Sequence, residues 1–213
     1  MRILLLTYFL TISFFSFAQT EIDNYFSIKF PERHSKLDTI IRGERININY
    51  VNNDIEAFSV AKLKIDSKEN ALNDLPYNLT SLDTLYQGIV RGQRSEMENA
   101  GYKFDGSESL EIDGFMGYHT KYVDPETNIK NAEFIILILN EETYVTSYIS
   151  HIDFDNVRKE NFFKSIKIDK DNNPSQFLGE PKAFKTGYVF GKFIIYGGLI
   201  LFVVWLIRRM SRK

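Results

Sequence analysis

The sequence contains no cysteine among its 213 residues. This absence excludes disulfide bonds, a thiolate nucleophile, a cysteine-based zinc site and a lipid-modified cysteine behind a signal segment. Exported animal domains commonly use disulfides, so a cysteine-free exported chain is more typical of a bacterial envelope. The fold must then depend on its hydrophobic core, which a chain that is 44% hydrophobic can supply.

Histidine is nearly as rare, and familiar catalytic patterns are missing. There is no GxSxG, HExxH, GxGxxG or CxxC pattern, which argues against several large enzyme classes. Only His34, His119 and His151 are present, and no metal-ligand spacing joins them. We therefore expect no enzyme activity, catalytic residue, cofactor or metal site. The alternative is a pocket in which His119 or His151 acts beside a carboxylate.

Two carboxylate pairs have i,i+2 spacing: Glu111 with Asp113, and Asp153 with Asp155. On a strand, such a pair faces one side and can hold a cation or share a proton. A hairpin turn explains the first pair better, and a helix cap explains the second.

The charge distribution argues against nucleic-acid binding. The formal net charge is -2, but all 28 acidic residues fall within residues 19–186, together with 20 of the 26 basic ones. The part of the chain between the two apolar ends therefore carries a net charge of about -8. An acidic domain of this kind does not seek nucleic acid.

Long apolar runs occur at the two ends of the chain. Residues 1–18 combine the basic Arg2, an apolar stretch and the small residues Ser16 and Ala18, which is the pattern of a cleavable signal peptide. We expect the mature protein to begin near Gln19. An uncleaved anchor is the weaker alternative, because the run is short for a membrane span.

Residues 187–207 form the second apolar run, interrupted only by Lys192. About 20 residues in a helix span the ~30 Å hydrocarbon core, so we expect a single transmembrane helix. Lys192 lies close enough to one end for its ammonium group to reach the lipid headgroups. Gly187 and Gly191 form a GxxxG pair, which favours at most a weak homodimer through this helix.

The segments beside this helix predict its orientation. Residues 208–213 carry four basic side chains, and the positive-inside rule places such a tail in the cytoplasm. Residues 169–186 are polar and contain Pro174 and Pro181, so we expect a linker. The sequence thus predicts a single-pass protein of the bacterial inner membrane with its domain on the periplasmic side.

Residues 19–168 are the expected domain, and their first half predicts strands followed by a helix. Apolar and polar residues alternate over Tyr25–Phe30, and Thr39–Val51 with Ile55–Ile65 predict a hairpin. From Ser81 to Ala100 the apolar spacing becomes helical. Thr80 or Ser81 can cap this helix beside Asp83, and Gly101 can end it.

The second half predicts mainly strands. Asp113-Gly114 is a hairpin turn sequence before the strand Phe115–Val123. Phe134–Leu139 is apolar at six successive positions, so both faces of that strand must be covered. After Thr143–Ile152, Asp153 or Asp155 can cap a short helix, and Ser165–Ile168 is a last extended piece.

Together these elements predict an α+β fold, in which an antiparallel sheet is sandwiched by one long and one short helix. Aromatic residues are abundant, with 12 Tyr and 18 Phe, and a core role is the default. Four tyrosines on the predicted strands are the candidates for an exposed aromatic stripe: Tyr118, Tyr122, Tyr144 and Tyr148.

Four short segments resemble the PsbP-like and DcrB-like accessory proteins of photosystems and bacterial envelopes. They are Tyr25–Pro31, Glu111–Gly114, Tyr144-Val145 and Phe162–Ile168. The resemblance covers Tyr25 to Ile168. It implies a binding or assembly factor and carries over no catalytic residue.

The sequence therefore favours a membrane-tethered periplasmic module that binds another envelope protein or helps a complex assemble. An envelope enzyme, or a carrier of a small ligand or lipid with a pocket near His119 or His151, is the alternative. The first hypothesis predicts an exposed interaction surface, and the second predicts a histidine beside a carboxylate in a cavity.

Overall fold

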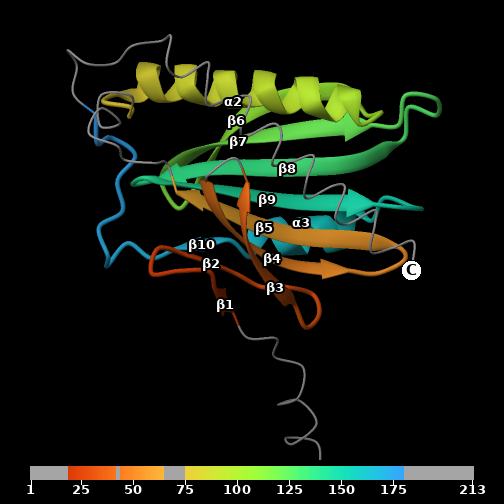
Figure 1. Ribbon diagram of the computed structural model, residues 1–213, viewed down its shortest axis with the longest axis horizontal. Coiled ribbons are helices and arrows are strands. Elements are labelled where there is room, and N and C mark those ends of the chain that lie inside the picture. The colour runs from red at the N-terminus through yellow and green to blue at the C-terminus, as the bar shows by residue number, and fades with distance from the viewer. Residues whose placement is uncertain (1–18, 42–43, 65–74, 180–213) are drawn as a thin grey trace, which may run out of the picture.

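The computed structural model describes residues 19–41, 44–64 and 75–179 (Figure 1). The predicted signal peptide, transmembrane helix and basic tail lie outside these residues, as does the GxxxG pair. Within the described residues, no helix is both long and apolar enough to cross a membrane. The predicted anchor at 187–207 therefore stays a prediction.

The described residues form an α+β fold with antiparallel sheets and two helices, as the sequence predicts (Figure 1). The larger sheet has seven strands in the order β3-β4-β5-β9-β8-β7-β6, and every neighbouring pair is antiparallel. Its strands are β3 (Ser35–Ile41), β4 (Glu44–Asn52), β5 (Glu56–Lys64), β6 (Lys103–Ile112), β7 (Phe115–Val123), β8 (Lys130–Leu139) and β9 (Glu142–Ser150).

Strand β8 explains why the large sheet has two cores. Its apolar run continues through Leu139, and the side chains of successive residues leave opposite faces of the sheet. Phe134, Ile136 and Ile138 join the core under the long helix. Ile135 and Leu137 join the core on the other face. The prediction that both faces of this strand are covered is confirmed.

Helix α2 (Leu79–Asn99) covers the first face and lies over β6 and β7 (Figure 1). Its N-cap is Asn78, not Thr80 or Ser81 as predicted, and Ser81 completes a capping box with it. Both side chains satisfy backbone N–H groups at the helix start, which stabilises the first turn. Gly101, at φ +86°, follows the helix end as predicted.

The opposite face is covered by a short helix and a small sheet. Helix α3 (Asn156–Lys164) is capped by Asp155, as predicted, whose carboxylate accepts hydrogen bonds from Val157 N and Arg158 N. The small sheet has the order β1-β2-β10. Its strands are β1 (Thr20–Glu21), β2 (Phe26–Ile28) and β10 (Lys167–Ile168).

One strand prediction was wrong. Thr39–Val51 was expected to be one strand, but the chain reverses within it and β3 pairs antiparallel with β4 from Ser35 to Tyr50. The segment lacks the Asn-Gly or Asp-Gly pair that marks a two-residue turn, so its alternating pattern looks continuous. By contrast, the turn at Asp113-Gly114 has positive φ at both residues and confirms the predicted hairpin.

The segment after Ile168 packs against the domain as far as Gly179. Gln176 is buried between β7 and β8, where its side-chain amide donates to Met116 O at 2.7 Å and to Ile138 O at 2.9 Å. Gly179 N donates to Pro76 O, and a Cβ at Gly179 would lie 1.8 Å from Leu75 O. The described part of the expected linker, residues 169–179, therefore packs against the domain, because the Gln176 side chain completes the backbone hydrogen bonding of β7 and β8.

Candidate functional site

A buried ionic cluster lies beneath α3, on the face of the sheet opposite α2. Glu133 on β8 has no solvent exposure. Its Oε2 lies 2.7 Å from His119 Nε2 on β7 and 3.0 Å from Lys159 Nζ on α3. His119 on β7 pairs with Ile135 on β8, and Glu133 lies two residues from Ile135 on the same strand. Because alternate residues of a strand face the same side, His119 and Glu133 point to the same face of the sheet. The cluster therefore joins three elements by charge-assisted hydrogen bonds.

The charges of this cluster hold Glu133 ionised. Burial by itself would raise the pKa of Glu133, but the hydrogen bonds from His119 and Lys159 and the charge of Lys159 outweigh burial and lower the pKa to about 2. A second carboxylate, Glu108 on β6, lies 3.4 Å from His119 Nδ1 and also pairs with Lys121. The Lys121 hydrogen bond lowers the pKa of Glu108. His119 thus lies between an exposed and a buried carboxylate.

A second buried carboxylate, that of Glu56, lies beside Arg158, the residue before Lys159 on α3. Glu56 Oε1 on β5 pairs with the Arg158 guanidinium at 2.8 Å, and Glu56 Oε2 accepts a hydrogen bond from Tyr148. Burial and this acceptor both raise the pKa of the Tyr148 hydroxyl. Arg158 also borders a pocket of about 400 Å³ lined by Lys29, Phe30, Pro31, Arg158, Asn161 and Phe162.

The three histidines do not converge. His34 stacks on Phe30 with 5.0 Å between ring centroids, and burial and the nearby Lys36 lower its pKa. His151 lies 3.4 Å from Asn52 Oδ1. His119 has a carboxylate within hydrogen-bond reach, that of Glu133. Within the same residues, no group of three His, Asp or Glu side chains is arranged to hold a metal ion.

The other sequence candidates have structural roles. Asp113 lies in the β6–β7 turn and its carboxylate accepts a hydrogen bond from Ile168 N. Asp155 caps α3. The expected exposed tyrosine stripe does not form, because all four tyrosines are buried: Tyr118, Tyr122, Tyr144 and Tyr148. They lie on β7 and β9, which are inner strands of the large sheet with a hydrophobic core on each face.

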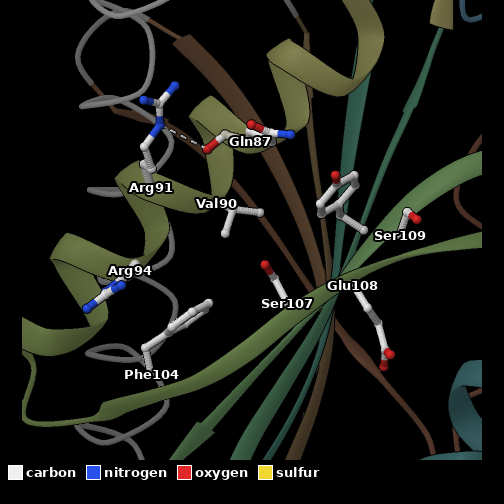
Figure 2. Close-up of a pocket in the computed structure, with 9 residues that line it drawn as sticks. Gln87, Val90, Arg91, Arg94, Phe104, Ser107, Glu108 and Ser109 are labelled. Atoms are coloured by element: carbon white, nitrogen blue, oxygen red, sulfur yellow. Dashed lines mark hydrogen bonds between the residues drawn. The ribbon is translucent and has the colours of Figure 1, made fainter. Parts of the chain in front are cut away.

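An open groove runs between α2 and β6, with a volume of about 440 Å³ (Figure 2). Figure 2 shows Val90 of α2 and Ser107 of β6 pointing toward one another across it, whereas Glu108 points to the other side of the strand. The lining residues come from three elements: Gln87, Val90, Arg91, Arg94, Phe104, Ser107, Glu108, Ser109 and Tyr118. The groove is thus half polar and open along the edge of the sheet.

Different charged side chains lie at the two ends of this groove. Toward the end of α2, Arg94 Nε donates to Glu98 at 2.8 Å, and the guanidinium carbon lies 5.0 Å from the centre of the Phe104 ring. Toward the start of α2, the Asp83 carboxylate accepts hydrogen bonds from Tyr118 and Gln87. Two arginines therefore border one end of the groove, and at the other end a carboxylate bonds to two of the lining side chains.

The sequence did not point to this groove. Gln87, Arg91 and Arg94 fall on the polar side of the helical pattern, and Ser107 and Ser109 fall on an unremarkable polar strand. The only available indication was the α2 periodicity, because it assigns these three helix residues to a side away from the core. The sequence pattern does not give the order of strands in the sheet, so it could not show that β6 is the edge strand beside α2.

Comparison with solved structures gives a loose likeness of fold. No protein-family model matches the chain, and no curated protein matches its sequence. The solution structure of cyanobacterial PsbP (CyanoP) from Synechocystis sp. PCC 6803 is similar over 70% of this chain and 90% of that chain. The identity is 14% and the TM-score is 0.43. The likeness is one of fold alone, and the resemblance to PsbP-like and DcrB-like proteins stays a prediction.

Proposed function

We propose that this protein is a membrane-tethered binding or assembly-accessory module that holds another envelope protein on the periplasmic side of a bacterial inner membrane. Its domain is exported behind the signal peptide at 1–18, and the helix at 187–207 retains it. The tail at 208–213 lies in the cytoplasm. The protein acts without catalysis.

The observation that carries this proposal is the open groove between α2 and the edge strand β6. Its volume of about 440 Å³ is large enough for several side chains of a partner. Its lining combines an apolar residue, Val90, with hydroxyl, amide and guanidinium groups, which suits recognition of a protein segment. His119 borders neither of the two pockets described above.

The tether keeps this groove near the membrane. Seven residues, 180–186, separate Gly179 from the predicted helix. Fully extended, they reach at most about 25 Å. Gly179 contacts the segment just before α2, so the start of α2 lies within this reach of the membrane surface. A partner in the groove is then itself membrane-bound or close to the membrane.

Crosslinking in living cells tests the proposal. The full chain is crosslinked with formaldehyde, purified, and its partners are identified by mass spectrometry. Ser107→Trp fills the groove from an exposed position and is expected to reduce recovery of the partner at least tenfold. Ser35→Trp, the same change at an exposed position on the opposite edge strand β3, is the matched control and leaves recovery unchanged. Equal recovery with both variants contradicts the groove as the interaction surface.

The enzyme or carrier alternative has one observation in its favour, the 2.7 Å contact between His119 and Glu133. A general base needs such a partner, but here Lys159 binds the same carboxylate oxygen. His119→Gln separates the two functions by its effect on activity. A binding module retains its partner in this variant and has no activity to lose, whereas an enzyme that uses His119 as its general base loses its activity.

A further inference from the structure

The outer side of β6 offers unpaired backbone groups. β6 is the last strand of the large sheet and pairs only with β7. Among residues 19–41, 44–64 and 75–179, none hydrogen-bonds to the outer N–H and C=O groups of β6. A strand edge of this kind is a template for another extended chain. β3 is the opposite edge of the sheet, away from α2.

The shape of the groove suits an added strand. A β-bulge between Phe104 and Gly106 interrupts β6, and from Ser107 to Ile112 the strand pairs regularly with β7. Ser107 and Ser109 present small side chains beneath α2, which leaves the groove open above them. Side chains of an added strand would alternate, with every second one entering the groove opposite Val90.

The charges along the groove indicate which side chains of an added strand it favours. Arg91 and Arg94 border the end near Phe104, and Arg94 retains further N–H donors beyond the one that Glu98 accepts. At the other end, Asp83 bonds to Tyr118, whose cross-strand partner is Ser109. Glu111 follows two residues later on the same face of β6 and is exposed. Arginines thus border one end of the groove, and two carboxylates lie beside its other end.

We propose that the groove binds an extended segment of a partner protein, which adds to β6 as an eighth strand of the sheet. Its groove-facing residues are acidic at the Arg91 and Arg94 end, apolar opposite Val90, and basic at the Asp83 and Glu111 end. Backbone hydrogen bonds supply the affinity of such a complex, and the alternate side chains supply specificity. This inference rests on the proposed function and names the chemistry of its partner.

Four labelled heptapeptides test the charge pattern against the full-length protein in detergent micelles. Two carry mixed charges, Thr-Glu-Thr-Val-Thr-Lys-Thr and Thr-Lys-Thr-Val-Thr-Glu-Thr, which present the same pattern in opposite chain directions. Two carry a single sign, with Glu or with Lys at both positions. We expect one mixed peptide to bind at least tenfold more tightly than both single-sign peptides by fluorescence anisotropy. Equal binding of all four, or binding of none, overturns the inference.

Hydrogen exchange locates the bound peptide. Binding should slow amide exchange within Lys103–Ile112 and leave Ser35–Ile41 on the other edge unchanged. Protection of another surface, with no change in β6, overturns strand addition even if a peptide binds.

A charge reversal supplies a readout that misfolding would not produce. In the double variant Arg94→Glu/Glu111→Lys, both changed positions are exposed on the surface. Because Arg91 and Asp83 are unchanged, each end then carries one charge of each sign, and the preference between the two mixed peptides is expected to disappear. An unchanged preference contradicts the assignment of the two ends.

The outcomes distinguish this inference from the proposed function. If cells yield an envelope partner that depends on the groove while no peptide adds to β6, the binding module stands and strand addition fails. If peptides add to β6 but no partner is recovered in cells, the proposed function fails.

Discussion

Glu133 is a carboxylate with no solvent exposure that contacts His119 and Lys159 from two other elements. A buried charge of this kind is costly unless its partners are retained. The cluster therefore helps to fix α3 on the sheet. The residue that most resembles a catalytic group is thus explained by packing and charge pairing.

Replacing this carboxylate tests its structural role. Glu133→Gln leaves the buried Lys159 ammonium beside a neutral amide, with the more exposed Glu160 as its remaining carboxylate partner, and we expect the free energy of unfolding to fall by about 3 kcal/mol. Urea unfolding of the full chain, followed by circular dichroism, measures this change. Glu108→Gln removes the exposed carboxylate on the other side of His119 and should cost less than about 1 kcal/mol. Similar losses in both variants would contradict the account.

The depressed pKa of Glu133 also predicts a pH dependence. The pKa is about 2 in the folded protein and 4.5 ordinarily, so the unfolded chain binds a proton that the folded protein does not bind between these values. The stability that Glu133 contributes is fully present above pH 4.5 and is lost as the pH falls toward 2. The stability difference between the natural protein and Glu133→Gln should therefore narrow over this range. A difference that stays constant from pH 6 to pH 2.5 would show that the charge is not responsible.

Gln176 shows how a segment outside the strands completes the sheet. The paired register of β7 and β8 ends at Gly117 and Leu137. Beyond this point, the backbone groups of Met116 and Ile138 do not pair with each other. They form hydrogen bonds with the Gln176 amide and the Tyr86 hydroxyl instead. The segment that leads toward the predicted anchor is therefore joined to the core of the domain.

Gln176→Ala removes three of these hydrogen bonds and leaves Met116 N and Ile138 O without their side-chain partner. We expect a loss of about 2 kcal/mol in the free energy of unfolding. Hydrogen exchange at Met116 should also become faster. Gln87→Ala, which removes an exposed amide bonded to Asp83, is the matched control and should change stability by less than about 0.5 kcal/mol. Unchanged exchange at Met116 would argue against this role for Gln176.

Elements with strong local patterns could be predicted from the sequence. The helical spacing of Leu82, Leu85 and Ile89 predicted α2, and Asp113-Gly114 predicted its hairpin, because both signatures lie within a few residues. The β3–β4 reversal was missed because its turn has no such signature. The Glu133 cluster and the α2–β6 groove could not be predicted, because each joins residues whose contact depends on the strand order of the whole sheet.

On the scale of the whole molecule, the sheet separates two different kinds of polar group. Under α3, charges are buried and paired, and they serve stability. Under the open side of α2, polar groups line a groove beside an unpaired strand edge. The binding surface proposed above therefore lies on the α2 side, away from the paired charges under α3.

Site-specific photocrosslinking in cells tests the binding surface most directly. A photoreactive amino acid is placed at Ser107 or Ser109 in the groove, and at Ser35 on the opposite edge, each in the full chain. The account predicts that both groove positions crosslink to the same envelope protein and that Ser35 does not. Crosslinks from Ser35 to that protein, with none from Ser107 or Ser109, would contradict the account.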